Sequence, residues 1–461
     1  MLKSTRLKVA FGAAVAAAAL AVAGVAAAPA VAATPHGPAA PQKSSHALGQ
    51  PRLYVKSPSA DGVKQALQLA KNHDTKDAVA LAKLLATPQA VWLTSGTPAE
   101  VRKTVQQNVA AATVEKAVPV FVVYNIPGRD CGSYSAGGAQ TTADYEAWID
   151  GVAAGIGNAK AAVLVEPDGL GLLPNTNCGV TTPGADDARY TQLGYAVDAL
   201  EAKPNTSVYL DGTNAAWLTP GDLAPRLIKA GVNRAQGFFT NVSNYQWTAN
   251  SAEIGTWISD CIALVNAGDA DPGADCPNQY WNGTGALDTN KQWSQTAADP
   301  AANTAWIDQQ YAAKLAAAGA TPTAHVVIDT SRNGAGPNDM SRYAAAPYNQ
   351  SAATIATLRA SNWCNPPGAG LGLTPTTKTG RPLVDAYLWV KTPGESDGQC
   401  DAAGGARAWD YSVYSQPGWP TDAASQALFD PLWGLADPAA GDWFPQQALD
   451  LIAHASPALL P

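Results

Sequence analysis

Charged residues are scarce in this chain of 461 residues: they make up 14% of it, and the formal net charge is −8. Such a chain lacks the basic face that nucleic-acid binding requires. After the N-terminal segment there is no run of eighteen apolar residues, so we expect no membrane-spanning helix. The five histidines are scattered and no CxxC pair is present, which argues against a zinc site and a thiol catalyst. GxSxG, GxGxxG and P-loop motifs are missing too, and we expect neither a metal nor a cofactor.

The N-terminus has the parts of a secretory signal peptide. Three basic residues lie among the first eight, an apolar run covers residues 9–28, and Ala30-Val31-Ala32 supplies a cleavage site. The alternative, an uncleaved membrane anchor, fits less well because the small residues of the cleavage site follow the apolar run directly. We therefore predict that residues 1–32 are a signal peptide and that the protein is secreted.

The rest of the chain divides in two by composition. Residues 33–50 are rich in Ala, Pro and Ser, which predicts a disordered segment. Residues 51–461 contain no Ser/Thr/Pro linker long enough to separate modules, so we predict a single domain, without an attached binding module, and a monomer. The chain has 14 Trp and 15 Tyr against 6 Phe. Aromatic rings with a polar tip suit amphipathic ligands such as sugars, although core packing accounts for most such residues.

The domain repeats one pattern: a short continuous apolar run, a polar cluster, then a helix-favouring stretch. Continuous apolar runs are typical of strands that are buried on both faces. The runs are residues 118–124, 162–165, 207–210, 237–239, 325–328 and 384–390. The helix-favouring stretches include residues 143–156, 191–202 and 304–318. This alternation predicts an α/β fold with βα units around a parallel sheet, either a barrel or a doubly wound open sheet.

Each apolar run is followed by charged or amide side chains. These residues are Arg129 and Asp130, Glu166 and Asp168, Asp211, Asn241, Asp329, and Lys391, Glu395 and Asp397. Taken one at a time, the acids have an ordinary explanation, since pairs such as Asp168-Gly169 favour turns. In parallel barrels, however, the carboxyl ends of the strands form the active-site face. Acids that recur after successive buried strands therefore favour an active site lined by carboxylates.

Grouped carboxylates can hydrolyse a glycosidic bond. One carboxylic acid, kept protonated, gives its proton to the leaving oxygen, and a second carboxylate activates water or attacks the sugar carbon. Neighbouring like charges raise the pKa of one acid into the useful range. A cluster of Asp130, Asp168 and Asp397 would supply this arrangement. An inverting enzyme would hold its two carboxyl groups about 6.5–9.5 Å apart, and a retaining enzyme about 5 Å apart.

The cysteines are even in number, which in an exported chain predicts disulfide bonds. They are Cys131, Cys178, Cys261, Cys276, Cys364 and Cys400. Six cysteines allow fifteen sets of three pairs, and the sequence alone does not choose among them. Our hypothesis is that each cysteine pairs with its nearest neighbour along the chain.

Eight short stretches stand out, in order, along nearly the whole domain. They are VVYNIPGRDCG (122–132), VEPDGLG (165–171), YLDGTNAAWL (209–218), NVSNYQWT (241–248), IDTSRNGAGP (328–337), WCNPPGAGLG (363–372), DAYLWVKTPGESDGQC (385–400) and AGDWFP (440–445). Together they resemble glycoside hydrolase family 6, the cellulases that include endoglucanases and cellobiohydrolases. The resemblance implies a distorted (β/α) barrel with about seven parallel strands, an active site at the carboxyl ends of the strands, and hydrolysis of β-1,4-glucan with inversion.

The resemblance also implies roles for individual residues. Asp168 would be the general acid, Asp130 would raise the pKa of that acid and help to order the attacking water, and Asp397 is the usual candidate for the general base. The implied sugar-binding residues are Tyr124 beneath the sugar at the cleavage point, Lys391 and Glu395 at its hydroxyls, Asp211 in support, and Trp92, Trp217 and Trp363 as stacking platforms. The disulfides of the family agree with the first and third of the nearest-neighbour pairs.

The mode of attack on the glucan stays open. The insertion 251–323 and the stretch 401–439 are longer than an open cleft needs, and long segments in compact domains are usually functional. They would either roof the site, as in a cellobiohydrolase, or pack on the flank of the barrel. We favour an endoglucanase, because 251–323 bears little resemblance to the roofing loops of cellobiohydrolases. The remaining alternatives are a secreted carbohydrate-binding protein that has lost turnover and a glycosidase for mixed-linkage glucan or xylan.

Overall fold

The computed structural model describes residues 48–49, 51–268, 271, 275–280 and 304–460. The chain divides into two units, residues 1–42 and 43–461, and the described residues belong to the second. The predicted signal peptide lies outside the described residues, as does the predicted disordered segment except for residues 48 and 49.

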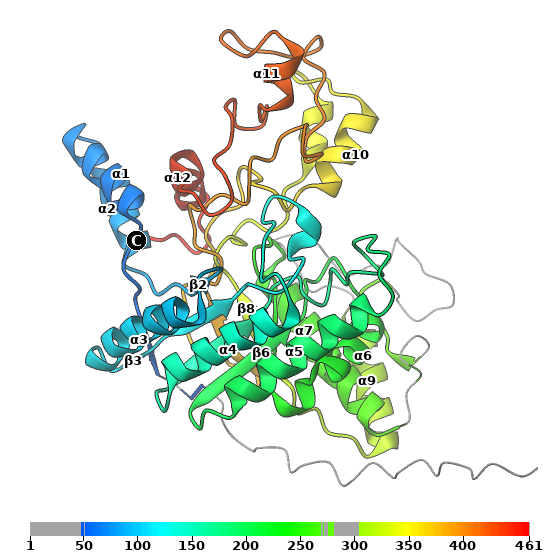
Figure 1. Ribbon diagram of the computed structural model, residues 1–461. Helices are drawn as coiled ribbons and strands as arrows, with labels where there is room; N and C mark the ends of the chain where they lie inside the picture. Colours follow the sequence, from blue (N-terminus) through cyan, green and yellow to red (C-terminus); the bar gives the residue numbers. More distant parts are fainter. Residues whose placement is uncertain (1–47, 50, 269–270, 272–274, 281–303, 461) are drawn as a thin grey trace, which may run out of the picture. The chain divides into compact units, whose positions relative to one another are not determined.

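Seven parallel strands form the central sheet, and each strand is hydrogen-bonded to the next one along the chain. They are β2 (Val91–Leu93), β4 (Val120–Val123), β5 (Ala161–Val165), β6 (Thr206–Asp211), β7 (Gly237–Thr240), β8 (His325–Asp329) and β9 (Val384–Leu388). The sheet curls so that its edge strands approach each other, and the N–H of Ala90 donates to the carbonyl of Trp389 at 3.0 Å. The prediction of a distorted (β/α) barrel with about seven strands is confirmed (Figure 1).

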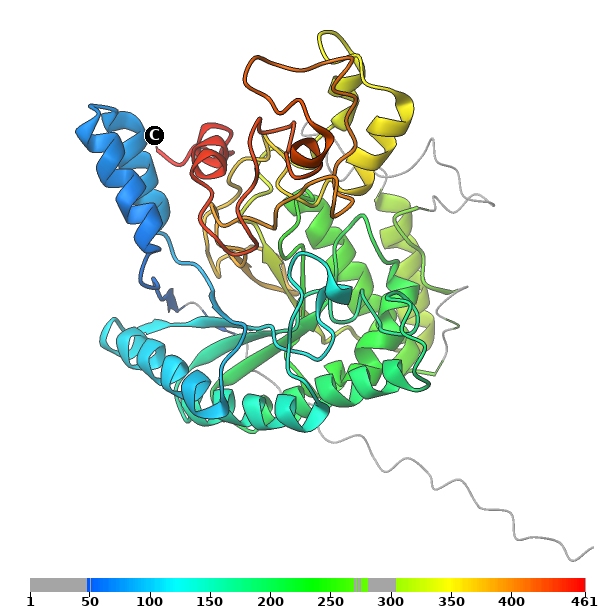
Figure 2. The same ribbon diagram turned by 45° about the horizontal axis from the view of Figure 1, so that its top comes forward.

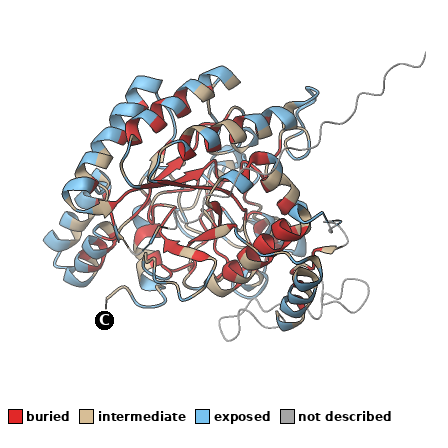
Figure 3. Ribbon diagram, turned by 90° about the horizontal axis from the view of Figure 1, so that it is seen from below, coloured by how far each residue is buried: buried red, intermediate tan, exposed pale blue. Residues whose placement is uncertain are grey.

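Successive residues of each strand face opposite sides of the sheet. In β4, Phe121 and Val123 belong to the core between the sheet and the outer helices, whereas Val120 and Val122 belong to the core inside the curled sheet. Both sides are apolar, which explains why the strands appear in the sequence as continuous apolar runs. Figure 3 shows buried residues along the strands and on the inward faces of the helices.

Helices cover the outer face of the sheet. They are α3 (Pro98–Val114), α4 (Thr142–Ile156), α5 (Ala185–Glu201), α6 (Pro220–Ala230), α7 (Thr248–Asn266) and α9 (Ala305–Ala318). Helix α3 begins with a capping box: the Glu100 carboxylate accepts the N–H of Thr97 at 2.8 Å, and the Thr97 hydroxyl accepts the N–H of Glu100 at 3.3 Å. Gly151 of α4 allows α3 to pack closely, because a Cβ there would lie 2.4 Å from the carbonyl oxygen of Pro98.

The structure differs from the sequence-based prediction at several element boundaries. The predicted run 118–124 is divided at Pro119, and β3 (Ala117–Val118) pairs with β1 (Arg52–Leu53) in a separate small sheet. Strand β2 was not among the predicted runs, because three residues are too few to form a pattern. Helix α5 begins at Ala185, ahead of the predicted start.

The described parts of 251–323 pack on the flank of the barrel. Helix α7 begins before this stretch, and its side chains Trp257 and Ile258 are fully buried in the core beneath the outer helices. Helix α9 contributes Ile307 and Tyr311 to the same core. The expectation of an insertion is therefore wrong for this helical part, which is the crossover that connects β7 to β8. Residues 281–303 lie outside the described residues.

A short 3-10 helix, η2 (Val232–Arg234), links α6 to β7, and six further elements lie beyond the barrel proper. They are α1 (Ala60–Lys71), α2 (Thr75–Leu85), η4 (Met340–Ala344), α10 (Ala352–Ala360), α11 (Ala423–Ala427) and α12 (Pro445–Ala453). Helices α10 and α11, with their loops, form a lobe on the side toward which the strands' carboxyl ends point (Figures 1 and 2). In the part of the chain that the structure describes, no helix combines the length and apolarity needed to cross a bilayer.

Candidate active site

Polar side chains gather where the strands of the barrel end. Asp211 is the last residue of β6 and Asp329 the last of β8, while Tyr124 and Glu166 directly follow β4 and β5. Parallel strands direct their carboxyl ends to the same face. The structure therefore brings the predicted carboxylates to one end of the barrel, where they interact as described below.

Asp168 lies in the turn that follows β5. The turn is closed by the N–H of Gly169, which donates to the carbonyl of Glu166 at 2.8 Å, and Asp168 itself takes a positive φ of 65°. Burial, together with the negative charges of Asp211, Asp130 and Asp397, raises the pKa of Asp168 well above its ordinary value. These electrostatic interactions join the three predicted catalytic carboxylates and Asp211, and they favour the protonated form of Asp168.

Asp130 stands at the start of η1 (Asp130–Gly132), on the loop that follows β4. One of its oxygens accepts the N–H of Ser135 at 2.8 Å, and burial raises the pKa of its carboxyl. Arg129, its neighbour, donates to the carbonyl oxygens of Ser135 and Thr94, at 2.7 and 3.0 Å. The guanidinium also stacks over the Tyr124 ring, 4.6 Å from its centroid. Arg129 therefore orders the loop that carries Asp130 through backbone groups.

Two fully or almost fully buried acids support the loops of the site by accepting backbone N–H groups. Glu166 accepts the backbone N–H groups of Asn125 and Ile126 at 3.0 and 3.1 Å, and burial raises its pKa to about 7. Asp211 accepts the N–H groups of Leu170 and Gly171 at 3.1 and 3.2 Å, and burial raises its pKa to about 6. Asp211 thus fastens the loop after Asp168. From the sequence, Glu166 could be placed at a strand end but no role was assigned to it. Its position directly after β5 was the feature that could have indicated a role in the site.

Asp397 has several donors. Arg332 donates to both of its oxygens, at 2.8 and 2.9 Å, and the Tyr245 hydroxyl donates at 3.0 Å. The Nζ of Lys391 lies 3.5 Å away. Burial would raise the pKa of Asp397, but the charges of Arg332 and Lys391 outweigh it and hold the pKa below its ordinary value. Arg332 and Tyr245 were not predicted as site residues, although both lie in stretches that carry the family resemblance.

Lys391, Glu395 and an unpredicted lysine lie close together beside this group. Lys391 donates to the carbonyl of Ser396 at 2.9 Å, and burial lowers its pKa. Lys56 donates to the Thr392 hydroxyl at 2.7 Å; burial lowers its pKa, and it interacts electrostatically with Glu395 and Lys391. Lys56 could not be predicted from the sequence because it lies 336 residues from Thr392 along the chain.

The predicted aromatic residues take two different positions. Tyr124 is buried and meets Trp92 edge to face at 5.5 Å, and the indole N–H of Trp92 donates to the carbonyl of Val390 at 2.8 Å. Trp217 is half-buried and packs so closely over Gly171 that a Cβ there would lie 2.3 Å from its ring. Trp363 is 39% exposed. Trp363 therefore offers the most accessible ring of the three predicted platforms.

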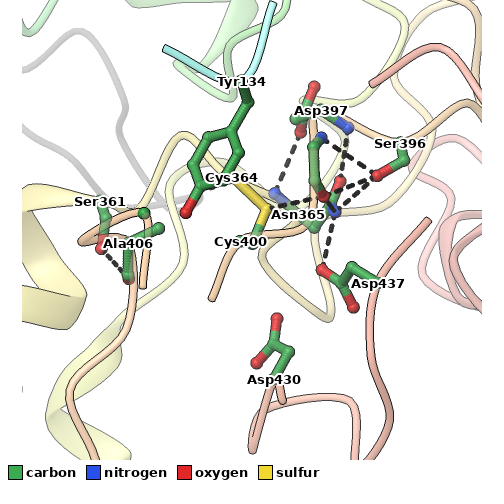
Figure 4. Close-up of a disulfide and its surroundings, with 12 residues drawn as sticks. Tyr134, Ser361, Cys364, Asn365, Ser396, Asp397, Cys400, Ala406, Asp430 and Asp437 are labelled. Atoms are coloured by element: carbon green, nitrogen blue, oxygen red, sulfur yellow. Dashed lines mark hydrogen bonds between the residues drawn. A yellow bond between two sulfur atoms is a disulfide. The ribbon is translucent and has the colours of Figure 1, made fainter. Parts of the chain in front are cut away.

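Two of the three disulfides hold loops that bear the acids. The structure has the three nearest-neighbour pairs, Cys131–Cys178, Cys261–Cys276 and Cys364–Cys400. Beside the last of these, the N–H of Asn365 donates to Asp397 at 3.0 Å, and its side-chain amide donates to Asp437 at 2.8 Å (Figure 4). The Asp397 loop is thereby fixed by a covalent bond and a buried polar network.

A curled parallel sheet whose strand ends carry coupled carboxylates and aromatic rings defines a glycoside hydrolase of the (β/α)-barrel type. The chain belongs to glycoside hydrolase family 6: the profile described as "Glycosyl hydrolases family 6" matches residues 48–263 and 286–455.

Named relatives agree with this assignment. Endoglucanase A of Thermobispora bispora is 30% identical over 378 residues, which cover 81% of this chain and 64% of that protein. A probable 1,4-beta-D-glucan cellobiohydrolase C of Aspergillus niger is 29% identical over 92% of this chain and 82% of its own length. The structure of the endoglucanase Cel6 from Mycobacterium tuberculosis superposes with a TM-score of 0.57 at 31% identity, covering 89% of this chain and 99% of that one. Three bacterial endoglucanases are matched over 64%, 66% and 54% of their length, so this chain spans less than two thirds of each.

Proposed function

We propose that this protein is a secreted enzyme that hydrolyses β-1,4-glucan with inversion. The observation that carries the proposal is Asp168, a carboxyl group in the turn after β5 whose pKa is raised by burial and by three neighbouring acids. A carboxyl group that keeps its proton to higher pH than an ordinary Asp is what a glycosidase needs to protonate the leaving oxygen. A carbohydrate-binding protein that had lost turnover would have no use for it.

The residues divide the work in a way that follows from their surroundings. Asp168 gives its proton to the glycosidic oxygen. Asp130 keeps the pKa of Asp168 high through its charge and helps to order the water that attacks the opposite face of the sugar. Asp211 holds the Asp168 loop in place. Asp397, predicted as the base, is an ionised group with its oxygens already occupied by donors, so we propose that it acts mainly through its charge.

A β-1,4-glucan fits the side chains that flank the acids. Sugar rings have apolar faces that stack on aromatic rings and hydroxyl edges that need hydrogen bonds. Trp92, Trp217 and Trp363 supply rings, and Lys391 and Glu395 supply the polar partners. Residues 51–461 form the catalytic domain in this proposal, and residues 1–32 direct it out of the cell.

Within this class we favour an endoglucanase, in keeping with the named bacterial relatives. A cellobiohydrolase is the second candidate, and one contact favours it. The loops after β4 and β9 meet where the backbone N–H of Asp401 donates to the Tyr134 hydroxyl at 3.2 Å, and the hydroxyl donates to the Asp401 carbonyl at 3.2 Å. A contact of this kind would enclose part of a substrate chain.

Proton NMR of the mature protein acting on cellohexaose, recorded within minutes of mixing, tests the proposal. Fresh α-anomer at the new reducing ends is the expected result, because inversion converts the β-linkage. Fresh β-anomer would contradict the inverting mechanism. The absence of cleavage would favour a carbohydrate-binding protein or an enzyme that acts on another glycan. Viscosity loss of carboxymethylcellulose relative to released reducing ends then separates internal from terminal cleavage.

A further inference from the structure

A second aromatic surface lies in the lobe that carries α10 and α11, on residues different from those of the active site. It is a hollow of about 910 Å³, lined by the start of α10 and by residues 408–426. Its aromatic lining consists of Trp409, Tyr411 and Trp419, all half-buried. We call this feature the lobe hollow. Its volume falls in the range typical of small-ligand sites, roughly 300–1,000 Å³.

The aromatic rings of the lobe hollow support one another. Trp419 packs against Trp409, Tyr411 and Phe429 with ring centroids 6.4, 6.1 and 5.3 Å apart. The first two pairs meet edge to face and the third is tilted. Edge-to-face pairs hold a preferred orientation, and each adds about 0.5–1.5 kcal/mol beyond area burial. The rings therefore form a preorganised surface, which loses little freedom when a ligand binds.

The loop that carries these rings is firmly attached. At its start, Arg407 donates to both oxygens of Asp430, at 2.9 and 2.7 Å, in a buried ion pair. The side chain of Gln350 then pairs with the backbone of Asp410 in both directions, at 2.8 and 3.2 Å. The ion pair, the Gln350 contacts and the ring cluster together give the lobe hollow a defined shape.

The polar lining matches a sugar rather than a charged ligand. Hydroxyl and amide groups of Ser351, Thr354, Ser415, Gln416 and Gln426 accompany the rings. The one acid of the lining, Asp410, has its carboxylate engaged by the N–H and hydroxyl of Ser412, at 2.9 and 2.5 Å. Neutral donors and acceptors around aromatic faces suit a chain of glucose residues, whose rings are apolar on their faces and hydroxylated at their edges.

We propose that the lobe hollow is a second binding site for β-1,4-glucan, which holds the polymer while the active site cuts it. The choice of glucan rests on the proposed function. In a domain predicted to have no attached binding module, such a site would raise the local concentration of substrate by linking two weak attachments.

The test compares insoluble with soluble substrate. Trp419→Ala and Tyr411→Ala, singly and together, are introduced into the full mature chain that also carries Asp168→Asn, and depletion from phosphoric-acid-swollen cellulose gives the binding constant. We expect the double variant to bind about tenfold more weakly. In the active background, kcat/KM on cellohexaose should stay unchanged, because a hexamer bound at the acids does not need the lobe hollow.

Three further variants guard against a structural explanation. Val413→Ala, on the same loop, exposed and outside the lining, is the matched control and should bind like the parent. Trp419→Phe keeps a packed ring, and Gln416→Ala removes no ring, only a side-chain amide that donates to the Tyr414 hydroxyl; each should weaken cellulose binding by a smaller factor with an unchanged thermal midpoint. If these two and the double variant all bind cellulose like the parent, the proposal is overturned.

The outcomes also separate this proposal from the proposed function. An equal loss of binding to cellulose and of kcat/KM on cellohexaose would mean that the lobe acts only by supporting the active site, and the second site would be rejected. If the parent cleaves no cello-oligosaccharide but the double variant still loses cellulose binding, the proposed function fails and the lobe hollow stands as a glucan site.

Discussion

Arg332 holds both carboxylate oxygens of Asp397, with nitrogen–oxygen distances of 2.8 and 2.9 Å. Both side chains are almost inaccessible to solvent, at 0% and 6%. A bidentate pair of this kind fixes the position of the carboxylate and stabilises its ionised form. With Tyr245 and the Asn365 N–H also donating, Asp397 has few lone pairs left to take a proton from water.

Asp397→Asn should therefore reduce kcat by about a hundredfold or more, because the active site loses a preorganised negative charge and Arg332 is left without a partner. We expect added azide, a nucleophile that needs no deprotonation, to leave this loss in place. The measurement is kcat on cellohexaose with and without azide. Restoration of activity, with formation of the α-glycosyl azide, would identify Asp397 as the general base that the sequence had suggested.

Asp130→Asn should move the alkaline limb of the pH–activity profile to lower pH by about one unit. Asp168 must be protonated to act, and its activity is lost as pH rises through its pKa. Removing the negative charge of Asp130 makes ionisation of Asp168 easier, so that pKa falls. The measurement is log kcat/KM against pH. An unchanged alkaline limb would show that Asp130 does not affect the pKa of Asp168. Asp168→Asn, which should nearly abolish cleavage, is the control for the acid itself.

The fold could be predicted from the sequence because its strands are buried on both faces. Val120–Val123 and Ala161–Val165 consist of apolar residues only; Glu166 directly follows the second strand, and Asp130 lies on the loop after the first. The cluster of Asp130, Asp168 and Asp397 could be proposed because strand ends of a parallel barrel share one face. Strand β2 was not predicted, because a three-residue element has no measurable periodicity.

The partners that set the charge of these acids could not be predicted. Arg332 lies 65 residues from Asp397 along the chain, and Tyr245 lies 152 residues from it. Their meeting depends on how β7, β8 and β9 are placed side by side, and on loops whose course no local pattern specifies. For the same reason the stretch 401–439 could be called long from the sequence, but its ring cluster and its attachment to Gln350 could not be foreseen.

Trp363→Ala should weaken the binding of cellohexaose about tenfold while changing the thermal midpoint by no more than about 2 °C. The side chain is 39% exposed and touches Tyr134 at a tilted 6.1 Å, so little packing is lost with it. Calorimetric titration in the Asp168→Asn background and a melting curve give the two quantities. Val114→Ala, 85% exposed on the outer helix α3, controls for surface truncation. Normal affinity with a large fall in stability would mean that Trp363 contributes to core packing and not to sugar binding.

Asp437→Asn should make the protein less sensitive to alkaline pH. Burial and the negative charge of Asp430 raise the pKa of Asp437 to about 9, whereas an unfolded Asp has a pKa of about 3.9. The folded state therefore keeps a proton that the unfolded state releases. The stability from this group is complete below about pH 4 and declines by up to about 1.4 kcal/mol per unit as pH rises toward 9.

An Asn at position 437 reproduces the neutral acid, because its amide can donate to Asp430 while its carbonyl accepts from Asn365. Urea unfolding at pH 5 and pH 8.5 measures the effect. Wild type and variant should be similarly stable at pH 5, and the variant should be more stable at pH 8.5. Asp442→Asn, an exposed carboxylate nearby, should follow the wild type at both values. If Asp437→Asn also follows the wild type at pH 8.5, the carboxyl of Asp437 is ionised in the folded protein, and Arg407, which pairs with Asp430, offsets the negative charge of Asp430.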